Sequence, residues 1–270
     1  MEDIKNIERK RIVCDMMVWY NIGYGKIQVP DKNKFQLVAT FNNFQEINYT
    51  KKVFTDFKLL KGACNAIIKY AEIIIDEPPI AYMHNIANPQ NAMKQESVYY
   101  SAVKEISVKD NVKPTIKSLK NFNNLLISYR NNINEHFVNY TTSEINNSRE
   151  LIHANSNSKN HFNEIIKKNV NREKSITNLE DQVINEIKYH FPNFEILNIE
   201  FWEDIKLYVL CRKTYFMLLK RDKTRIVNFN DLVDLLNLVY VNKKSLYWTE
   251  EGSWKEIIMQ AGCEGYLYKS

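Results

Sequence analysis

The sequence predicts an α/β protein in which segments from both ends of the chain build one parallel sheet. Strand-like and helix-like segments alternate at each end, which is typical of sheets made from βαβ units. Between residues 90 and 221 the pattern changes to helix, and the only strand suggested there is a weak one at residues 194–199. The chain has 6 glycines in 270 residues, too few for a turn-rich all-β fold.

The first elements are a short strand and a helix. Residues 12–14 (Ile-Val-Cys) are typical of a buried strand, because all three are apolar. The strand ends at Asp15, a carboxylate placed directly after an apolar run. Residues 16–22 have helical character, and we expect that helix to stop at Gly23.

A second strand and further helical sequence follow. Residues 35–39 form an apolar strand that leads into a helix, with Thr40 as its N-cap and Asn43 in its first turn. Residues 53–75 carry apolar side chains at helical spacing, which predicts a long helix. This helix is expected to end before Pro78, because the residue preceding a proline disfavours the helical conformation.

The middle of the chain is predicted to be a helical insertion. Apolar side chains recur every three or four residues over residues 126–140, and a second long helix is indicated over residues 151–170. A pair of antiparallel helices is the expected shape. The domain organisation is therefore an α/β domain made of residues 1–85 and 222–270, interrupted by an insertion at residues 86–221.

The C-terminal part returns to alternating elements. We expect a helix over residues 228–240, a strand over 245–248, a helix over 253–261 and a final strand over 265–269. This order matches the α/β pattern of the N-terminal part, so both parts belong to one sheet.

Charge and cysteine usage narrow the classes of protein. The net charge of +5 permits a polyanionic partner but does not require one. The four cysteines form no CxxC pair, and no apolar leader or membrane-spanning run is found. We therefore expect a cytoplasmic protein with free, mostly buried thiols, without a structural zinc site and without a membrane segment.

Five acidic residues are the candidates for chemistry: Asp15, Glu46, Asp231, Asp234 and Glu251. Each follows a strand or lies on the polar side of a helix. Taken alone, most have an ordinary explanation, since acids near a helix start favour the helix dipole and glutamates on helices are usually solvated. Asp15 is the exception, because a charge at the end of an apolar strand needs a partner or a ligand.

The positions of these acids predict a metal site. In open parallel sheets the functional crevice lies outside the carboxyl ends of the strands, where Asp15 and Glu251 would both project. Crowded carboxylates repel one another unless a cation offsets them, and hard oxygen ligands suit Mg²⁺ or Mn²⁺. Such ions stabilise the charge that develops in phosphodiester hydrolysis.

Four segments resemble the motifs of the PIN-domain nuclease family, in the family's order. Residues 12–20 are similar to its first strand with an aspartate at the end, and residues 38–46 to its second motif with a glutamate on the following helix. Residues 230–234 resemble the third motif, in which aspartates begin a helix. Residues 247–251 resemble the closing motif, in which a threonine precedes an acid by two positions.

The resemblance covers about the first 80 and the last 50 residues, as judged from element boundaries that sequence places only roughly. It implies a doubly wound parallel sheet of PIN-like type and a metal-dependent endoribonuclease acting on RNA. It would make Asp15, Glu46, Asp231 and Glu251 the catalytic and metal-binding residues, with Asp234 assisting at the metal. The insertion would then contact the RNA, bind a protein partner or mediate self-association.

Two departures from the family pattern leave alternatives open. Met17 stands where the family has an asparagine, and Glu251 stands where it has an aspartate. These changes motivate a second reading, a catalytically degenerate PIN-like scaffold that binds RNA or protein. A third reading is a mixed α/β structural domain whose motif matches are accidental.

Overall fold

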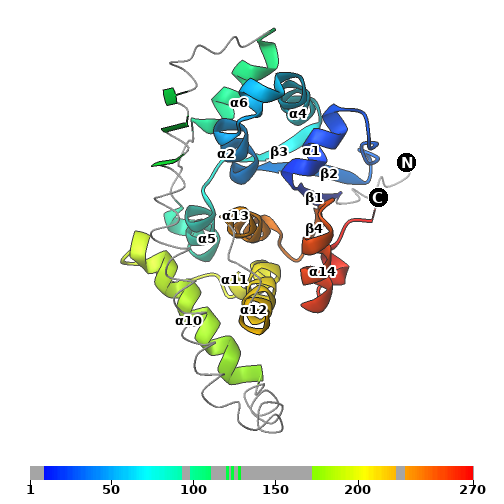
Figure 1. Cartoon of the computed structure of the whole chain (residues 1–270). Helices are drawn as coiled ribbons and strands as arrows, with labels where there is room; N and C mark the ends of the chain where they lie inside the picture. The colour runs from blue at the N-terminus through cyan, green and yellow to red at the C-terminus, as the bar shows by residue number, and fades with distance from the viewer. Residues whose placement is uncertain are drawn as a thin grey trace, which may run out of the picture.

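Four strands pair in parallel, in the order β3-β2-β1-β4. The structure, a computed structural model, describes residues 9–92, 98–110, 172–222 and 229–269, with isolated positions between 120 and 128. Within these residues the chain is an α/β protein with helices on both faces of the sheet (Figure 1). The strands are β1 (Lys10–Cys14), β2 (Phe35–Thr40), β3 (Ala71–Ile75) and β4 (Ser245–Trp248). The expected α/β class is confirmed.

Alternating side chains of the strands feed two separate cores. In β1, Ile12 and Cys14 lie in one core and Val13 lies in the other. In β2, Leu37 and Val38 divide in the same way. Successive side chains of a strand point to opposite faces, so a strand that is apolar throughout must be covered on both sides.

One face is covered by the helices that follow the first strands. They are α1 (Met16–Gly23), α2 (Phe41–Tyr49), the short α3 (Lys52–Thr55), α4 (Phe57–Tyr70) and α6 (Tyr99–Val108). Helices α1 and α4 touch at Gly23 and Gly62, where a Cβ atom added to Gly23 would collide with the backbone of Gly62. The close packing of these helices therefore depends on Gly23 having no side chain.

The other face is covered mainly by helices from the second half of the chain. They are α5 (Pro79–Ala87), α10 (Arg172–His190), α11 (Phe201–Asp204), α12 (Lys206–Arg221), α13 (Phe229–Asn237), the 3-10 turn η3 (Leu238–Tyr240) and α14 (Gly252–Gln260). Helices α10 to α12 fall within the range expected as an insertion, yet they share one apolar core with α13 and α14. The long helices expected over residues 126–140 and 151–170 lie outside the described residues.

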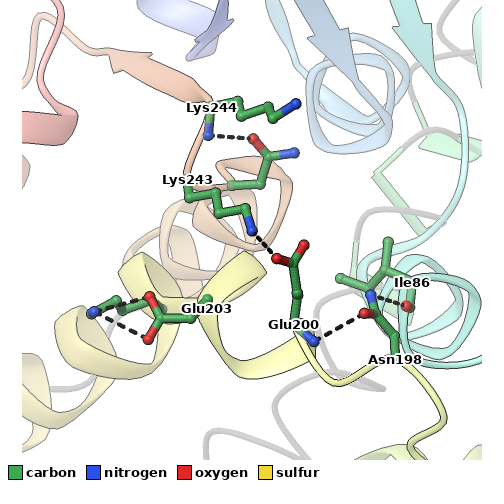
Figure 2. Close-up of polar contacts among 8 residues, drawn as sticks. Ile86, Asn198, Glu200, Glu203, Lys243 and Lys244 are labelled. Carbon is green, nitrogen blue, oxygen red and sulfur yellow. Dashed lines mark hydrogen bonds and ion pairs between the residues drawn. The ribbon is translucent and has the colours of Figure 1, made fainter.

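A chain of polar contacts fixes the approach to β4 (Figure 2). The Lys243 ammonium pairs with the Glu200 carboxylate at 2.6 Å, just before α11. The Glu200 backbone N–H donates to Asn198, whose amide donates to the carbonyl of Ile86 at 2.9 Å. These contacts tie the end of α5 and the start of α11 to the N-terminal end of β4, opposite to the end that carries the acidic residues.

Three predicted elements are corrected by the structure. The helix expected over residues 53–75 is divided into α3, α4 and β3, because Asp56 caps a new helix start and the run from Ala71 pairs with β2. Residues 194–199 form no strand. The final strand expected over 265–269 is reduced to a 3-10 turn, η4 (Glu264–Tyr266), and a single parallel bridge to β4. The remaining strands and helices that were expected within the described residues are confirmed.

Candidate functional site

The site begins with Asp15, which joins β1 to α1. Its side chain is 5% exposed. Oδ1 accepts a hydrogen bond from the backbone N–H of Val18 at 2.9 Å, so the carboxylate caps α1. The backbone N–H of Asp15 donates to the carbonyl of Trp248 at 3.0 Å, which fixes Asp15 beside the end of β4.

This position is the point where the strand order reverses. From β1 the chain proceeds to β2 and β3 on one side, whereas β4 adds on the other side. The chain therefore leaves the carboxyl ends of β1 and β4 in different directions. Open parallel sheets form their ligand crevices at such a reversal. Asp15 follows β1 there, and Thr249 to Glu251 follow β4.

The surroundings of Asp15 oppose its ionisation. Its pKa is raised from 3.8 to about 6, mainly by burial and to a smaller extent by the nearby charge of Glu251. The Thr249 hydroxyl and backbone N–H groups act in the opposite direction and limit the rise. Oδ2 is buried and has no partner in normal hydrogen-bond geometry. A buried carboxylate oxygen that lacks a donor is costly, and a cation is one way to satisfy it.

Glu46 reaches the same region from α2. The helix starts at Thr40, whose backbone N–H donates to the Asn43 side chain at 2.9 Å, as expected for a cap. Burial raises the Glu46 pKa from 4.5 to about 7, the Lys52 ammonium lowers it, and the charges of Asp15 and Glu251 raise it.

The two acids of α13 occupy different places. Burial raises the Asp234 pKa well above its usual range, and the charges of Glu251, Glu46 and Asp15 add to that rise. Burial also raises the Glu251 pKa, and the charge of Asp231 adds to that rise. Asp234 therefore has Glu251, Glu46 and Asp15 as charged neighbours, and Asp231 is a charged neighbour of Glu251.

All five acids expected from the sequence are therefore electrostatic neighbours in the structure. Asp231 and Asp234 are three positions apart, so they share a helix face.

A buried polar connection between α2 and α13 was missed by sequence reasoning. The Thr40 hydroxyl donates to Oδ1 of Asn237 at 2.7 Å, and the Asn42 amide donates to the Val233 carbonyl at 3.1 Å. These bonds hold the helix that carries Glu46 against the helix that carries Asp231 and Asp234. Thr40 and Asn237 are 197 positions apart, and the only sequence signal was that both are polar residues at helix ends.

Lys52 is the positive group next to the acids. Its ammonium lies 3.8 Å from the centre of the Tyr20 ring, a cation–π contact between α3 and α1. It lowers the pKa of Glu46. Lys52 is therefore a cation among the main causes of the pKa shifts of these acids in the described part of the chain.

The donor set has the chemistry that a hard divalent cation requires. Carboxylate oxygens are the preferred ligands of Mg²⁺ and Mn²⁺, and Oδ2 of Asp15 is a buried oxygen that lacks a hydrogen bond. Within the described ranges no three His, Cys, Asp or Glu side chains are close enough to form a complete metal-binding cluster. The acids are therefore electrostatic neighbours and not a closed ligand cage.

Two further expectations concern cysteines and membranes. All four cysteines are free and buried, as predicted. None of the helices in the described ranges is both long enough and apolar enough to span a bilayer.

Fold and site together define an α/β protein with a group of acidic residues near the strand-order reversal of a parallel sheet. Comparison of the chain with protein-family models, with curated proteins and with solved structures gives no match.

Proposed function

We propose that the protein is a PIN-like, metal-dependent endoribonuclease that hydrolyses RNA phosphodiester bonds at this group of acids. The observation that carries the proposal is the convergence of Asp15, Glu46, Asp234 and Glu251, which come from four separate segments of the chain. The charge of Glu251 raises the pKa of each of the other three. Neighbouring carboxylates repel one another and lower stability, and such clusters are typical of sites that bind a cation. The doubly wound arrangement of PIN-like type is part of this proposal.

Asp15, Glu46, Asp231, Asp234 and Glu251 would together hold one or two Mg²⁺ or Mn²⁺ ions. Bound there, the ion supplies Lewis-acid stabilisation of the charge that develops on a phosphodiester during hydrolysis. The pKa of Glu46 near 7 means that this carboxyl holds a proton in the metal-free protein at neutral pH about half of the time. Cation binding would release that proton.

The residues around the acids would serve orientation and exclusion of water. Asp15 is fixed by its cap to α1 and by the backbone contact to β4. Glu46 and the α13 acids are fixed relative to each other by the bonds from Thr40 and Asn42. Lys52 adds a positive group beside a site that must admit a polyanion.

The experiment is cleavage of a mixed single-stranded RNA pool by the pure protein with Mn²⁺. Asp15→Asn keeps the cap to α1, because asparagine caps helices as well as aspartate does, but it removes a charge from the site. Glu256→Gln is the matched control, since Glu256 is exposed on α14 and belongs to none of the acidic contacts above. We expect cleavage by the wild type and by the control, and none by Asp15→Asn. Equal cleavage by all three proteins would remove Asp15 from the mechanism.

A second candidate function is a PIN-like scaffold that binds RNA or protein without cleaving. It is favoured by Met17, which is 41% exposed beside Asp15 at the position of the family's asparagine. Calorimetry with Mn²⁺ separates the two functions. A degenerate scaffold should bind the ion poorly, and Asp15→Asn should then make no difference to binding.

A further inference from the structure

Two buried aromatic side chains lie behind the acids of α13. Tyr215 on α12 and Trp254 on α14 are 0% and 2% exposed. Their rings are stacked, with centroids 6.0 Å apart and planes inclined by 28°. Both belong to the core that covers the α13 face of the sheet. The pair is therefore a rigid unit formed by two helices.

Each ring donates one hydrogen bond to a different acid. The Tyr215 hydroxyl donates to Oδ2 of Asp231 at 3.0 Å. The Trp254 indole N–H donates to Oδ2 of Asp234 at 3.1 Å. Both bonds are made to Oδ2, so Oδ1 of each carboxylate is an oxygen that the aromatic pair does not use.

We propose that Tyr215 and Trp254 are positioning residues for the cation site, which fix the orientation of the two α13 carboxylates. This inference rests on the proposed function. It assigns the principal role to Trp254, because its partner Asp234 has Glu251, Glu46 and Asp15 as charged neighbours.

The physical reason is the freedom of an aspartate side chain. Both of its torsions would vary among like-charged neighbours that repel it, and a fixed donor selects one orientation. Tryptophan offers a single N–H on a ring that packing holds in place, so the direction of the bond is set by the core. Groups that orient metal ligands in this way typically change metal affinity by about 10–100-fold when they are removed.

The test is the Mn²⁺ affinity of the full chain, measured by calorimetry. Trp254→Phe removes the indole donor and should weaken binding about 10–100-fold. Trp202→Phe is the control, because Trp202 on α11 packs against the same core and its ring contacts Phe201, away from the segments that carry the five acids. It should bind Mn²⁺ as the wild type does.

A second pair of variants guards against effects of packing. Tyr215→Phe removes only a hydroxyl and should weaken binding less than Trp254→Phe does. Its control on the same helix is Tyr208→Phe, whose hydroxyl contacts Arg212 and none of the acids. Nuclear magnetic resonance adds a spectroscopic signature: Mg²⁺ should shift the indole N–H signal of Trp254 more than those of the other tryptophans, of which the chain has 4 in all.

The outcomes separate the inference from the function on which it rests. If the wild type binds Mn²⁺ and Trp254→Phe binds it equally well, the positioning role is overturned and the nuclease proposal stands. Equal weakening in Trp254→Phe and Trp202→Phe would also overturn it, because the effect would then be general. If the wild type binds no Mn²⁺, both proposals fall.

Discussion

Asp15→Asn should stabilise the metal-free protein, and the gain should grow with pH. The folded-state pKa of Asp15 is raised to about 6 from an ordinary value of 3.8, so the folded state binds the proton more tightly than the unfolded chain does. Stability is therefore retained at low pH and lost as the pH rises from the unfolded pKa through the folded one. Asparagine keeps the cap to α1 and has no charge to lose.

The magnitude follows from the same two pKa values. At about 1.4 kcal/mol for each pKa unit, the rise from 3.8 to about 6 makes ionised Asp15 cost about 3 kcal/mol in the folded state. Roughly half of this cost is incurred between about pH 5 and about pH 8. The advantage of Asp15→Asn over the wild type should therefore widen by about 1.5 kcal/mol across that interval.

The assay is urea unfolding in the presence of a chelator, at about pH 5 and about pH 8. Wild type, Asp15→Asn and the exposed control Glu256→Gln are compared. The control should follow the wild type at both pH values. If the unfolding free energy changes equally with pH in Asp15→Asn and in the wild type, the pKa of Asp15 is not raised in the folded state, and the reasoning is refuted.

Three other predictions test separate features. Mn²⁺ affinity should fall as the pH drops below about 7, because protons compete with the ion for Glu46. Calorimetry at several pH values measures this, and an affinity that does not change with pH would contradict the competition. Gly23→Ala should cost more than about 2 kcal/mol in thermal unfolding through its collision with α4, whereas Gly265→Ala, which meets open space, should stay within about 0.5 kcal/mol; equal effects would contradict the close contact. Glu186→Gln should cost about 2–3 kcal/mol in urea unfolding, since it leaves the buried Arg212 guanidinium without its carboxylate; a change below about 0.5 kcal/mol would show that solvent screens the pair.

The elements that sequence predicted well are those with a local cause. Thr40 and Asn43 mark a helix start by chemistry within one turn, and the structure has α2 beginning there. The strand at residues 12–14 is an apolar run in the middle of the sheet, buried on both faces. In each case the residues that determine the element are neighbours in the chain.

The elements that sequence predicted wrongly depend on distant partners. The run from Ala71 to Ile75 continues the apolar pattern of α4 but lies at the sheet edge, paired only with β2. The C-terminal segment forms a single bridge to β4, where a full strand was expected. Whether such short runs pair depends on a neighbouring strand that lies far away in sequence.

The sequence by itself determined the α/β class and the parallel character of the sheet. It also singled out five acids that are charged neighbours in the structure. These follow from periodicity, from the alternation of elements and from the cost of placing a charge at the end of an apolar strand. Only the tertiary structure decided that Tyr215 donates a hydrogen bond to Asp231 and that Trp254 donates one to Asp234. The reason is that a carboxylate's role depends on its distances to other charges and donors, and these are set by how α12, α13 and α14 pack.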